Sequence, residues 1–300
     1  LSKMPKLYQI LTDYDLPLIP VLYEMEKTGV LIDRAYFKEL KSEFTEKVAE
    51  LEQKIYSVCG VNFNVNSPIQ LSKVLFEDLA LPTKGIKKTT RGFSTGASEL
   101  DKLEGQHPVI EMIKEYREVS KLLSTYILPL PELAGEDGRI HTTFTQNVTA
   151  TGRLSSVNPN LQNIPVRSED GKRIRTGFVA ENGKILVSAD YAQFELRLAA
   201  ALAGDQKLIE SFAQNVDIHT KTAAEVFGIR MEDVSKIQRR AAKVINFGVL
   251  YGMSPKGLAD SAEMNFYEAK QFIDDYFRVR KPIKDYLEKT LQQAREEGFV

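Results

Sequence analysis

A long apolar stripe near the start of the chain places the strongest constraint on its fold. Between Asp33 and Gly60, apolar residues recur at spacings of three and four, which is the period of an amphipathic α-helix. They are Phe37, Leu40, Phe44, Val48, Leu51, Ile55 and Val58. Asp33 can cap the start of this helix, and Gly60 can end it. Because the stripe is narrow and lies among Lys and Glu residues, it predicts a helix paired with an antiparallel neighbour.

Two further helices are predicted after the first. The segment Ser67-Pro68-Ile69-Gln70 has the pattern of a capping box with Pro at the first helical position. A short helix should therefore run from there through Leu79. A third helix should run from about Pro108 to Ile127, where the prolines that follow, Pro129 and Pro131, should stop it. Together these segments indicate a helical arm over residues 20–128.

Positive charge gathers in two stretches, although the whole chain is nearly neutral, with 40 Lys and Arg against 41 Asp and Glu. The loop expected at the tip of the arm has no acidic residue and carries Lys84, Lys87, Lys88 and Arg91. Residues 139–168 also lack Asp and Glu, but hold Arg139, Arg153 and Arg167. Such patches are typical of a surface that binds a polyanion, although solvated loops would carry the same charges. Thr, Asn, Gln, Gly and Pro dominate the second stretch, and its arginines favour an ordered functional surface over disorder.

Several classes of protein are excluded or disfavoured by what the sequence lacks. Cys59 is the single cysteine, so there is neither a disulfide framework nor a thiolate metal site. Three scattered histidines do not suggest a zinc cluster. No run approaches the about 18 uncharged apolar residues of a membrane span, and no secretory signal opens the chain, so we expect a cytosolic protein. A P-loop kinase is excluded because no GxxxxGK[ST] pattern occurs.

An apolar run before Asp190 points to a possible metal ligand. Residues 184–190, KILVSAD, predict a buried strand that ends at this aspartate, and a helical pattern follows to Leu202. A carboxylate at the carboxyl end of a strand is well placed to hold a divalent cation, and Mg²⁺ prefers oxygen ligands. The alternative is that Asp190 caps the following helix.

The segment RRAAKVINFGVLYG predicts a helix with a chemically ordered face. Arg239, Lys243, Phe247 and Tyr251 are four residues apart, so on a helix they fan over about 120° and span about 18 Å. Cations contact phosphates and rings stack on bases, which fits a nucleoside triphosphate lying along the helix. Four apolar residues fall on the opposite side: Ala241, Ala242, Ile245 and Val249. The alternative is an amphipathic surface helix whose aromatic residues belong to the core. Two glycines, Gly248 and Gly252, weaken the helix and could permit bending.

Three long motifs resemble those of family A DNA polymerases. DYAQFELRLAA resembles motif A, RRAAKVINFGVLYG resembles motif B in the O helix of the fingers, and TATGRLSSVNPNLQNIPVR resembles the segment between these motifs and the thumb. The resemblance covers nearly all of residues 20–300 and is to the polymerase domain of the bacterial DNA polymerase I type. It implies an α+β right-hand fold. The parts would be an upstream tail (1–20), the thumb (21–130), a partial palm with a small antiparallel sheet (131–208) and mostly helical fingers (209–300).

The resemblance assigns roles to individual residues. Asp190 and the backbone carbonyl of Tyr191 would hold two catalytic Mg²⁺ ions, and Lys243 and Arg239 would join Asp190 as catalytic residues. Glu195 would be the steric gate that excludes a ribose 2′-hydroxyl. The nucleotide contacts would be Gln193, Glu195, His219, Arg239, Lys243, Phe247 and Tyr251. The contacts to primer-template DNA would be Lys84, Lys87, Lys88, Arg91, Arg153, Gln162, Asn163, Arg167 and Gly252.

The activity implied is DNA-templated DNA synthesis in replication and repair. Deoxynucleoside monophosphates would be added to a primer 3′ end by two-metal phosphoryl transfer with release of pyrophosphate. A monomeric protein of the bacterial cytoplasm, close to the nucleoid, is expected. In the family, motif C supplies a second metal-binding aspartate after the fingers, and no His-Asp-Glu triplet occurs here. We therefore expect the chain by itself to be inactive.

Two other functions compete with this one. The first is a module that binds primer-template or nucleotide without chemistry, and the absence of motif C keeps it open. The second is a single-subunit RNA polymerase, which Glu195 disfavours because excluding a 2′-hydroxyl is of no use to an enzyme that makes RNA. The residues QNIPVR point the same way. In the family, the strand expected at 184–190 pairs with strands that would follow residue 300, so we also expect loose packing there.

Overall fold

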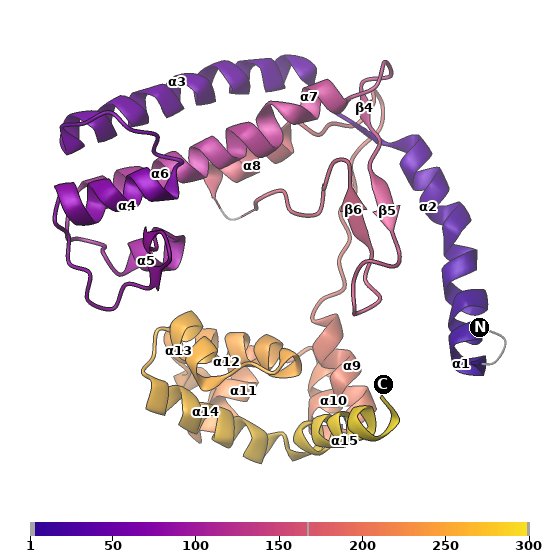
Figure 1. Ribbon diagram of the computed structural model, residues 1–300. Helices are drawn as coiled ribbons and strands as arrows, with labels where there is room; N and C mark the ends of the chain where they lie inside the picture. The colour runs from indigo at the N-terminus through magenta and orange to yellow at the C-terminus, as the bar shows by residue number, and fades with distance from the viewer. Residues whose placement is uncertain (1–3, 167, 299–300) are drawn as a thin grey trace. The chain divides into compact units, whose positions relative to one another are not determined.

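The structure is a computed structural model that describes residues 4–166 and 168–298 (Figure 1). It divides into two compact units, Leu1–Val187 and Ser188–Val300, which we call the N-terminal and C-terminal units. Among the described residues, no helix combines the length and the apolar character that crossing a membrane requires.

The N-terminal unit consists of helices and three pairs of short strands. Its helical segments are α1 (Pro5–Ile10), η1 (Leu11–Asp15), α2 (Leu16–Thr28), α3 (Arg34–Cys59), α4 (Pro68–Lys73), η2 (Val74–Asp78), α5 (Ala97–Asp101), α6 (Val109–Leu122), η3 (Leu123–Ile127), α7 (Pro129–Leu133) and α8 (Glu169–Thr176). Its strands are β1 (Val30–Leu31), β2 (Lys88–Thr89), β3 (Gly92–Phe93), β4 (Arg139–Ile140), β5 (Thr143–Thr145) and β6 (Ser155–Val157).

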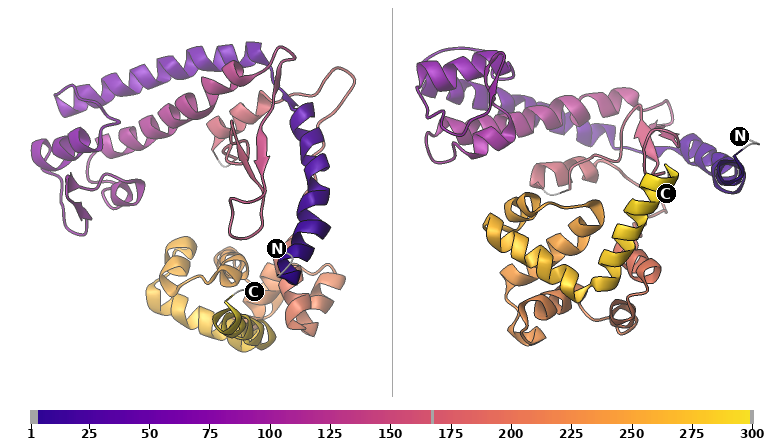
Figure 2. Two further views of the ribbon diagram at one scale, coloured as in Figure 1. Left: turned by 45° about the vertical axis from the view of Figure 1, so that its right-hand side comes forward. Right: turned by 60° about the horizontal axis from the view of Figure 1, so that its bottom comes forward.

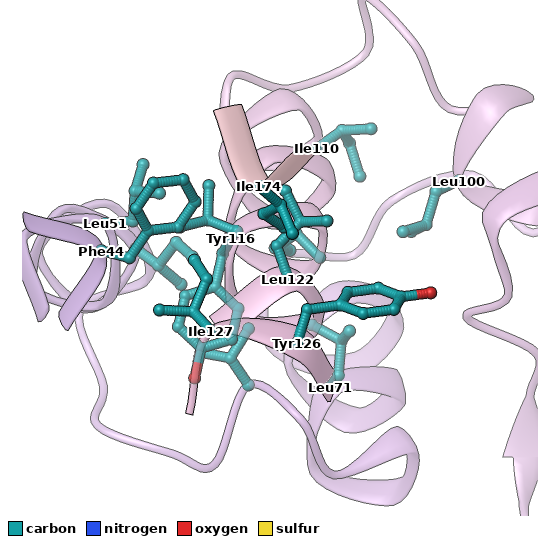
Figure 3. Packing of buried hydrophobic residues seen from close by; sticks show 14 of the residues in the cluster. Phe44, Leu51, Leu71, Leu100, Ile110, Tyr116, Leu122, Tyr126, Ile127 and Ile174 are labelled. Carbon is teal, nitrogen blue, oxygen red and sulfur yellow. The ribbon is translucent and has the colours of Figure 1, made fainter. Parts of the chain in front are cut away.

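The predicted long helix and its antiparallel partner form the core of the N-terminal unit. Helices α3 and α6 lie side by side in all views (Figures 1 and 2). Asp33 caps α3 by accepting a hydrogen bond of 2.9 Å from the backbone N–H of Tyr36, and Gly60 ends the helix in a left-handed conformation. Figure 3 shows Phe44 and Leu51 of α3 packed with residues of α6, η3 and α8. Each such side chain contributes about 2 kcal/mol when fully buried.

The strands form small antiparallel sheets of two strands each. β1 pairs with β4, β2 pairs with β3, and β5 pairs with β6, where Phe144 lies opposite Ser156. The polar stretch after residue 139 is therefore ordered, and it supplies three of these strands. The fold class is the predicted one, mostly helical α+β.

The helix predicted from about Pro108 to Ile127 is present as α6 and η3, which together span Val109–Ile127. A separate short helix, α7, begins at Pro129, because a proline in the first turn of a helix loses no hydrogen bond. One local prediction in the N-terminal unit was wrong. The capping box at residues 67–70 is only half formed. Ser67 accepts from the backbone N–H of Gln70, but the Gln70 side chain accepts from the backbone N–H of Asn64.

The buried strand predicted at residues 184–190 is also absent. The segment has no regular secondary structure, and Ile185, Leu186 and Val187 are exposed, with 80% of the surface of Val187 accessible. A strand needs a neighbour to pair its N–H and C=O groups, and no described residue supplies one. Apolar side chains by themselves do not form a strand.

The C-terminal unit is helical throughout its regular structure. Its elements are α9 (Phe194–Ala203), α10 (Gln206–Ala213), α11 (Ile218–Phe227), η4 (Met231–Asp233), α12 (Lys236–Gly248), η5 (Val249–Tyr251), α13 (Pro255–Ala262), α14 (Phe266–Val279) and α15 (Lys281–Glu297). One apolar cluster is formed by residues of α11, α12, α13 and α14, and a second by residues of α9, α10 and the starts of α11 and α15. The half-buried Leu250 packs against both clusters.

A buried ion pair holds the junction of α14 and α15. Arg280 lies between these helices with none of its surface exposed, and its guanidinium donates a hydrogen bond to the carboxylate of Glu225 in α11. Removing one partner of such a pair leaves an uncompensated buried charge, which costs more than the pair itself contributes.

We expect Glu225→Gln to lower the free energy of unfolding of the C-terminal unit by about 3 kcal/mol, because Arg280 loses its counter-charge. Urea titrations followed by circular dichroism would measure the loss, and hydrogen exchange in α14 and α15 would locate it. Glu232→Gln is the matched control, since Glu232 lies in an exposed pair with Arg230 and should cost less than about 0.5 kcal/mol. Equal effects of the two substitutions would contradict the expectation.

Candidate functional site

Helix α12 presents the two faces that its sequence predicts. A capping box between Ser235 and Gln238 starts the helix. The four predicted apolar residues face inward and are buried: Ala241, Ala242, Ile245 and Val249. On the other side Arg239 and Lys243 are exposed, Phe247 is half-buried, and Tyr251 is 63% exposed. The inward and outward faces are thus confirmed.

Two glycines shape the end of this helix. The α-helix ends at Gly248, and a single 3₁₀ turn carries the chain to Tyr251. A Cβ atom on Gly248 would overlap the side chain of Met253, so a larger residue here would force that flexible side chain to move. Gly252 has φ +69°, a left-handed conformation that glycine adopts without strain. These are local roles in packing and turning.

The first turn of α11 lies against this exposed face. Asp217 caps α11 by accepting hydrogen bonds from the backbone N–H groups of His219 (3.1 Å) and Thr220 (3.3 Å). Its other carboxylate oxygen accepts from Arg239 Nε at 2.8 Å. Partial burial raises the pKa of Asp217, but the hydrogen bonds from Arg239 and Thr220 outweigh it and lower this pKa to about 2. Arg239 is therefore held at the start of α11.

His219 is the most enclosed of the predicted site residues, with 4% of its surface exposed. Its Nδ1 lies 3.1 Å from Asn246 Nδ2, its Nε2 lies 3.4 Å from Gln193 Nε2, and its ring centroid is 5.6 Å from that of Phe247. Burial lowers the pKa of His219, as do the charges of Arg239 and Lys243, while Asp217 acts in the opposite direction. The imidazole is therefore neutral at physiological pH.

The segment before α9 carries the predicted metal ligands. Asp190 and Tyr191 are exposed in a stretch without regular structure, and the Tyr191 ring lies 5.5 Å from that of Phe194. Gln193, with φ +57°, occupies the N-cap position of α9, so the alternative that Asp190 caps this helix is wrong. Glu195 lies in the first turn of α9 and is half-buried.

Few of the described residues could act together as ligands of Mg²⁺. Mg²⁺ is commonly held by one or two carboxylates together with phosphates and water. The Asp190 carboxylate and the Tyr191 carbonyl suit that chemistry. However, the part of the chain that the structure describes contains no group of three or more Asp, Glu, His or Cys residues able to surround an ion. No catalytic step through a metal follows from this ligand set.

The predicted DNA contacts of the arm lie together on one loop. Lys84, Lys87, Lys88 and Arg91 are all exposed. The β2–β3 hairpin orders part of the loop, and the Lys88 ammonium lies 5.8 Å from the centroid of the Phe93 ring. Glu99 anchors the other part by accepting from the backbone N–H of Lys87 at 3.0 Å. The cationic side chains thus extend outward from an anchored backbone.

The predicted DNA contacts after residue 149 have local roles as well. Gln162 uses both ends of its amide inside the loop, accepting from the Ser156 N–H and donating to the Leu154 carbonyl. The carbonyl of Asn163 accepts from the Tyr126 hydroxyl at 2.5 Å, and the carbonyl of Arg153 accepts from Thr149. The side chains of Asn163 and Arg153 are exposed, and Arg167 lies outside the described residues.

Sequence reasoning missed three residues of this site: Asp217, Thr222 and Asn246. Asp217 could have been found from its position before a helical pattern, which is where N-caps occur. Asn246 could have been found as a polar residue on the inward face of α12, because a buried amide requires partners. Thr222 Oγ1 lies 3.2 Å from Asn246 Nδ2, but no sequence pattern brings these two residues together.

Comparison with known proteins identifies the family. Residues 34–300 match the family described as DNA polymerase family A. The chain belongs to DNA polymerase family A. It is 49% identical to a DNA polymerase I of Caldicellulosiruptor bescii over 95% of its length, and 48% identical to the thermostable DNA polymerase I of Thermus aquaticus over 98%. It spans 33% and 36% of the lengths of these two relatives.

A solved structure supports the same fold. The chain is similar to the POL domain of Pol1 from M. smegmatis, in a complex with DNA primer-template and dNTP, with a TM-score of 0.85 and 38% sequence identity. The similarity covers 97% of this chain and 51% of the other. The predicted right-hand polymerase fold is thereby confirmed.

The pairing of Asp217 with Arg239 predicts a pH dependence of stability. The pKa of Asp217 in the folded protein is about 2, below its ordinary value of 3.8. A depressed pKa means that the folded state binds the proton less readily, so this contribution to stability is present above the ordinary pKa and is lost as the pH falls toward 2.

We therefore expect the melting temperature of the wild-type protein to fall more steeply than that of Asp217→Asn between pH 5 and pH 2, because the variant has no carboxylate to protonate there. Thermal unfolding followed by circular dichroism would compare them. Asp233→Asn provides a control, since Asp233 forms an exposed pair with Arg230. Parallel curves for the wild type and Asp217→Asn would argue against the assignment.

Proposed function

We propose that this chain takes part in template-directed DNA synthesis, in which deoxynucleoside monophosphates are added to a primer 3′ end and pyrophosphate is released. The observation that carries the proposal is the arrangement around His219. Arg239 and Lys243 of α12 act electrostatically on this histidine of α11, and the Phe247 ring lies beside it. This set of groups suits a deoxynucleoside triphosphate. The two cations and the neutral N–H donor can contact phosphates, and the aromatic ring can stack on a base.

The proposed roles follow from the order of these groups along α12. Arg239, Lys243 and His219 would contact the triphosphate, and Phe247 would lie against the sugar and base, with Tyr251 one further turn along. Phosphoryl transfer depends mainly on positioning and on neutralising charge, so Arg239 and Lys243 would act during the reaction as well as in binding. Gln193 lies within contact distance of His219 and would belong to the same site. Glu195 would exclude a 2′-hydroxyl.

The metal chemistry of the reaction would centre on Asp190. Its carboxylate and the carbonyl of Tyr191 would contribute ligands to Mg²⁺, which would supply charge neutralisation at the reacting phosphate. The exposed position of both residues is compatible with that role. Completing the ligand set would require carboxylates beyond those that the described residues gather.

The cations of the N-terminal unit would hold the primer-template. The exposed loop residues Lys84, Lys87, Lys88 and Arg91 would contact phosphates, which binds DNA without regard to sequence. Arg153, Gln162, Asn163 and Arg167 would meet the backbone and minor groove, and Gly252 would lie near the template. The description of the M. smegmatis relative as a complex with primer-template and dNTP supports DNA and nucleotide as partners.

The division into functional parts follows the same proposal. Residues 21–130 would form the thumb, 131–208 part of the palm and 209–300 the fingers. The bacterial origin of the relatives supports a place in the bacterial cytoplasm, near the nucleoid. Action as a monomer remains a prediction.

We expect Lys243→Ala and Arg239→Ala to weaken binding of dTTP about tenfold or more, because each removes a charged hydrogen bond to phosphate. Calorimetric titration of the chain with dTTP and Mg²⁺ would measure this. Arg240→Ala is the matched control. Arg240 is the next residue on α12, so its side chain leaves the helix about 100° away from that of Arg239. It pairs with Glu263 and not with Asp217 beside His219, so its loss should leave affinity nearly unchanged. Equal weakening by Arg240→Ala and Lys243→Ala would refute the proposed site.

The 300-residue chain should bind primer-template in a gel-shift assay but should not extend the primer, because Asp190 has too few partners to hold two metal ions. The two assays should be run with the same DNA, Mg²⁺ and all four deoxynucleotides. Extension that disappears in Asp190→Asn would overturn this expectation and would mean that the chain assembles a complete metal site by itself.

Binding without chemistry is the second candidate function. The incomplete ligand set around Asp190 favours it for this chain taken alone. The result of the extension assay separates the two candidates.

A further inference from the structure

His219 lies between two amide groups that both direct a nitrogen toward its ring. Asn246 Nδ2 is 3.1 Å from Nδ1, and Gln193 Nε2 is 3.4 Å from Nε2. An amide nitrogen donates hydrogen bonds and does not accept them, while a neutral imidazole accepts at one nitrogen and donates at the other. One of the two amides must therefore present its oxygen instead, and the choice decides which ring nitrogen carries the proton.

Asn246 is the amide with the fixed orientation. It is 1% exposed, and its Nδ2 lies 3.1 Å from the ring and 3.2 Å from Thr222 Oγ1, so both N–H bonds have an acceptor, while its oxygen lies 3.4 Å from the same hydroxyl. Turning this amide would leave one buried N–H without an acceptor, which is costly. Gln193 is only half-buried and makes the longer contact. Turning the Gln193 amide leaves its nitrogen near solvent, which can accept from it. Gln193 is thus the residue that presents its oxygen to the ring.

The charges around His219 favour a ring with a single proton. Lys243 and Arg239 on α12 oppose an imidazolium ion, as does burial, whereas the carboxylate of Asp217 at the start of α11 favours it. Asp217 is itself bound to Arg239, which offsets its charge. The neutral ring must then place its proton on one nitrogen, and a proton on Nδ1 would face the N–H group of Asn246.

We propose that Asn246, oriented by Thr222, is a positioning residue that holds His219 as a neutral ring with its proton on Nε2. Gln193 accepts that N–H in the absence of nucleotide, and a phosphate oxygen of the nucleotide accepts it when bound. Asn246 thereby turns a buried histidine into a donor aimed at an anion without giving it a charge. The nucleotide part of the proposal rests on the proposed function, whereas the position of the proton does not.

The test is a nitrogen NMR measurement on the chain labelled with ¹⁵N-histidine. There are only three histidines, His107, His141 and His219, so each ring can be assigned by substitution. In the wild type, above neutral pH, His219 should show an unprotonated Nδ1 and a protonated Nε2. A proton on Nδ1 would overturn the proposal without the need for any variant.

Asn246→Asp should reverse the pattern, because a carboxylate only accepts and would draw the proton to Nδ1. Thr222→Val is a milder change that removes the orienting hydroxyl at nearly constant size, and it should give a mixture of the two ring forms. His107 and His141 are internal controls, and their signals should stay unchanged if the fold is intact. A proton that stays on Nε2 in a folded Asn246→Asp protein would contradict the role of Asn246.

Titration with dTTP and Mg²⁺ separates this inference from the proposed function. The wild-type Nε2 signal of His219 should shift on binding, and Asn246→Asp should lose about tenfold in affinity because the ring no longer donates. A proton on Nε2 with no response to dTTP would support the role of Asn246 and refute the nucleotide site. A proton on Nδ1 with a clear response would refute the role of Asn246 and leave the nucleotide site standing.

Discussion

The close packing of α11 against α12 is the interaction on which the candidate site depends. The buried residues at this contact include several alanines, Ala223 of α11 and Ala241 and Ala242 of α12, and the distance between helices depends on the size of such side chains. The two helices therefore approach closely enough for Arg239 to reach Asp217 and for Asn246 to reach His219. Larger side chains at the contact would separate these pairs, and the exposed cations of α12 would then be an ordinary solvated helix face.

The charged and the neutral polar side chains of this site lie at different depths. Arg239 and Lys243 lie on the exposed face, where a polyanion can reach them, while His219 and Asn246 lie beneath them in a buried network with Thr222. Asp217 neutralises part of the positive charge in the absence of a ligand and limits the repulsion between the cations.

The N-terminal unit illustrates how a rigid support can carry a charged loop. The pairing of α3 with α6 buries a continuous apolar core, and the loop that holds Lys84 to Arg91 is anchored to it through Glu99. Residues 185–187 show the opposite case. They have the apolar composition of a core strand, but none of the described residues pairs with them, and they remain exposed.

The helices and their faces could be predicted from the sequence because helical hydrogen bonds join residues four apart, so period and caps are local information. Asp33, the stripe of α3 and the inward alanines of α12 were all found in this way. The resemblance to the polymerase family added which exposed residues belong to a site. Features that depend on residues far apart in the sequence were decided only by the tertiary structure. The strand at 184–190 depends on a neighbour that its own residues do not specify, and the network of Gln193, His219 and Asn246 joins three elements. Such contacts depend on how whole helices pack, and no short pattern encodes that.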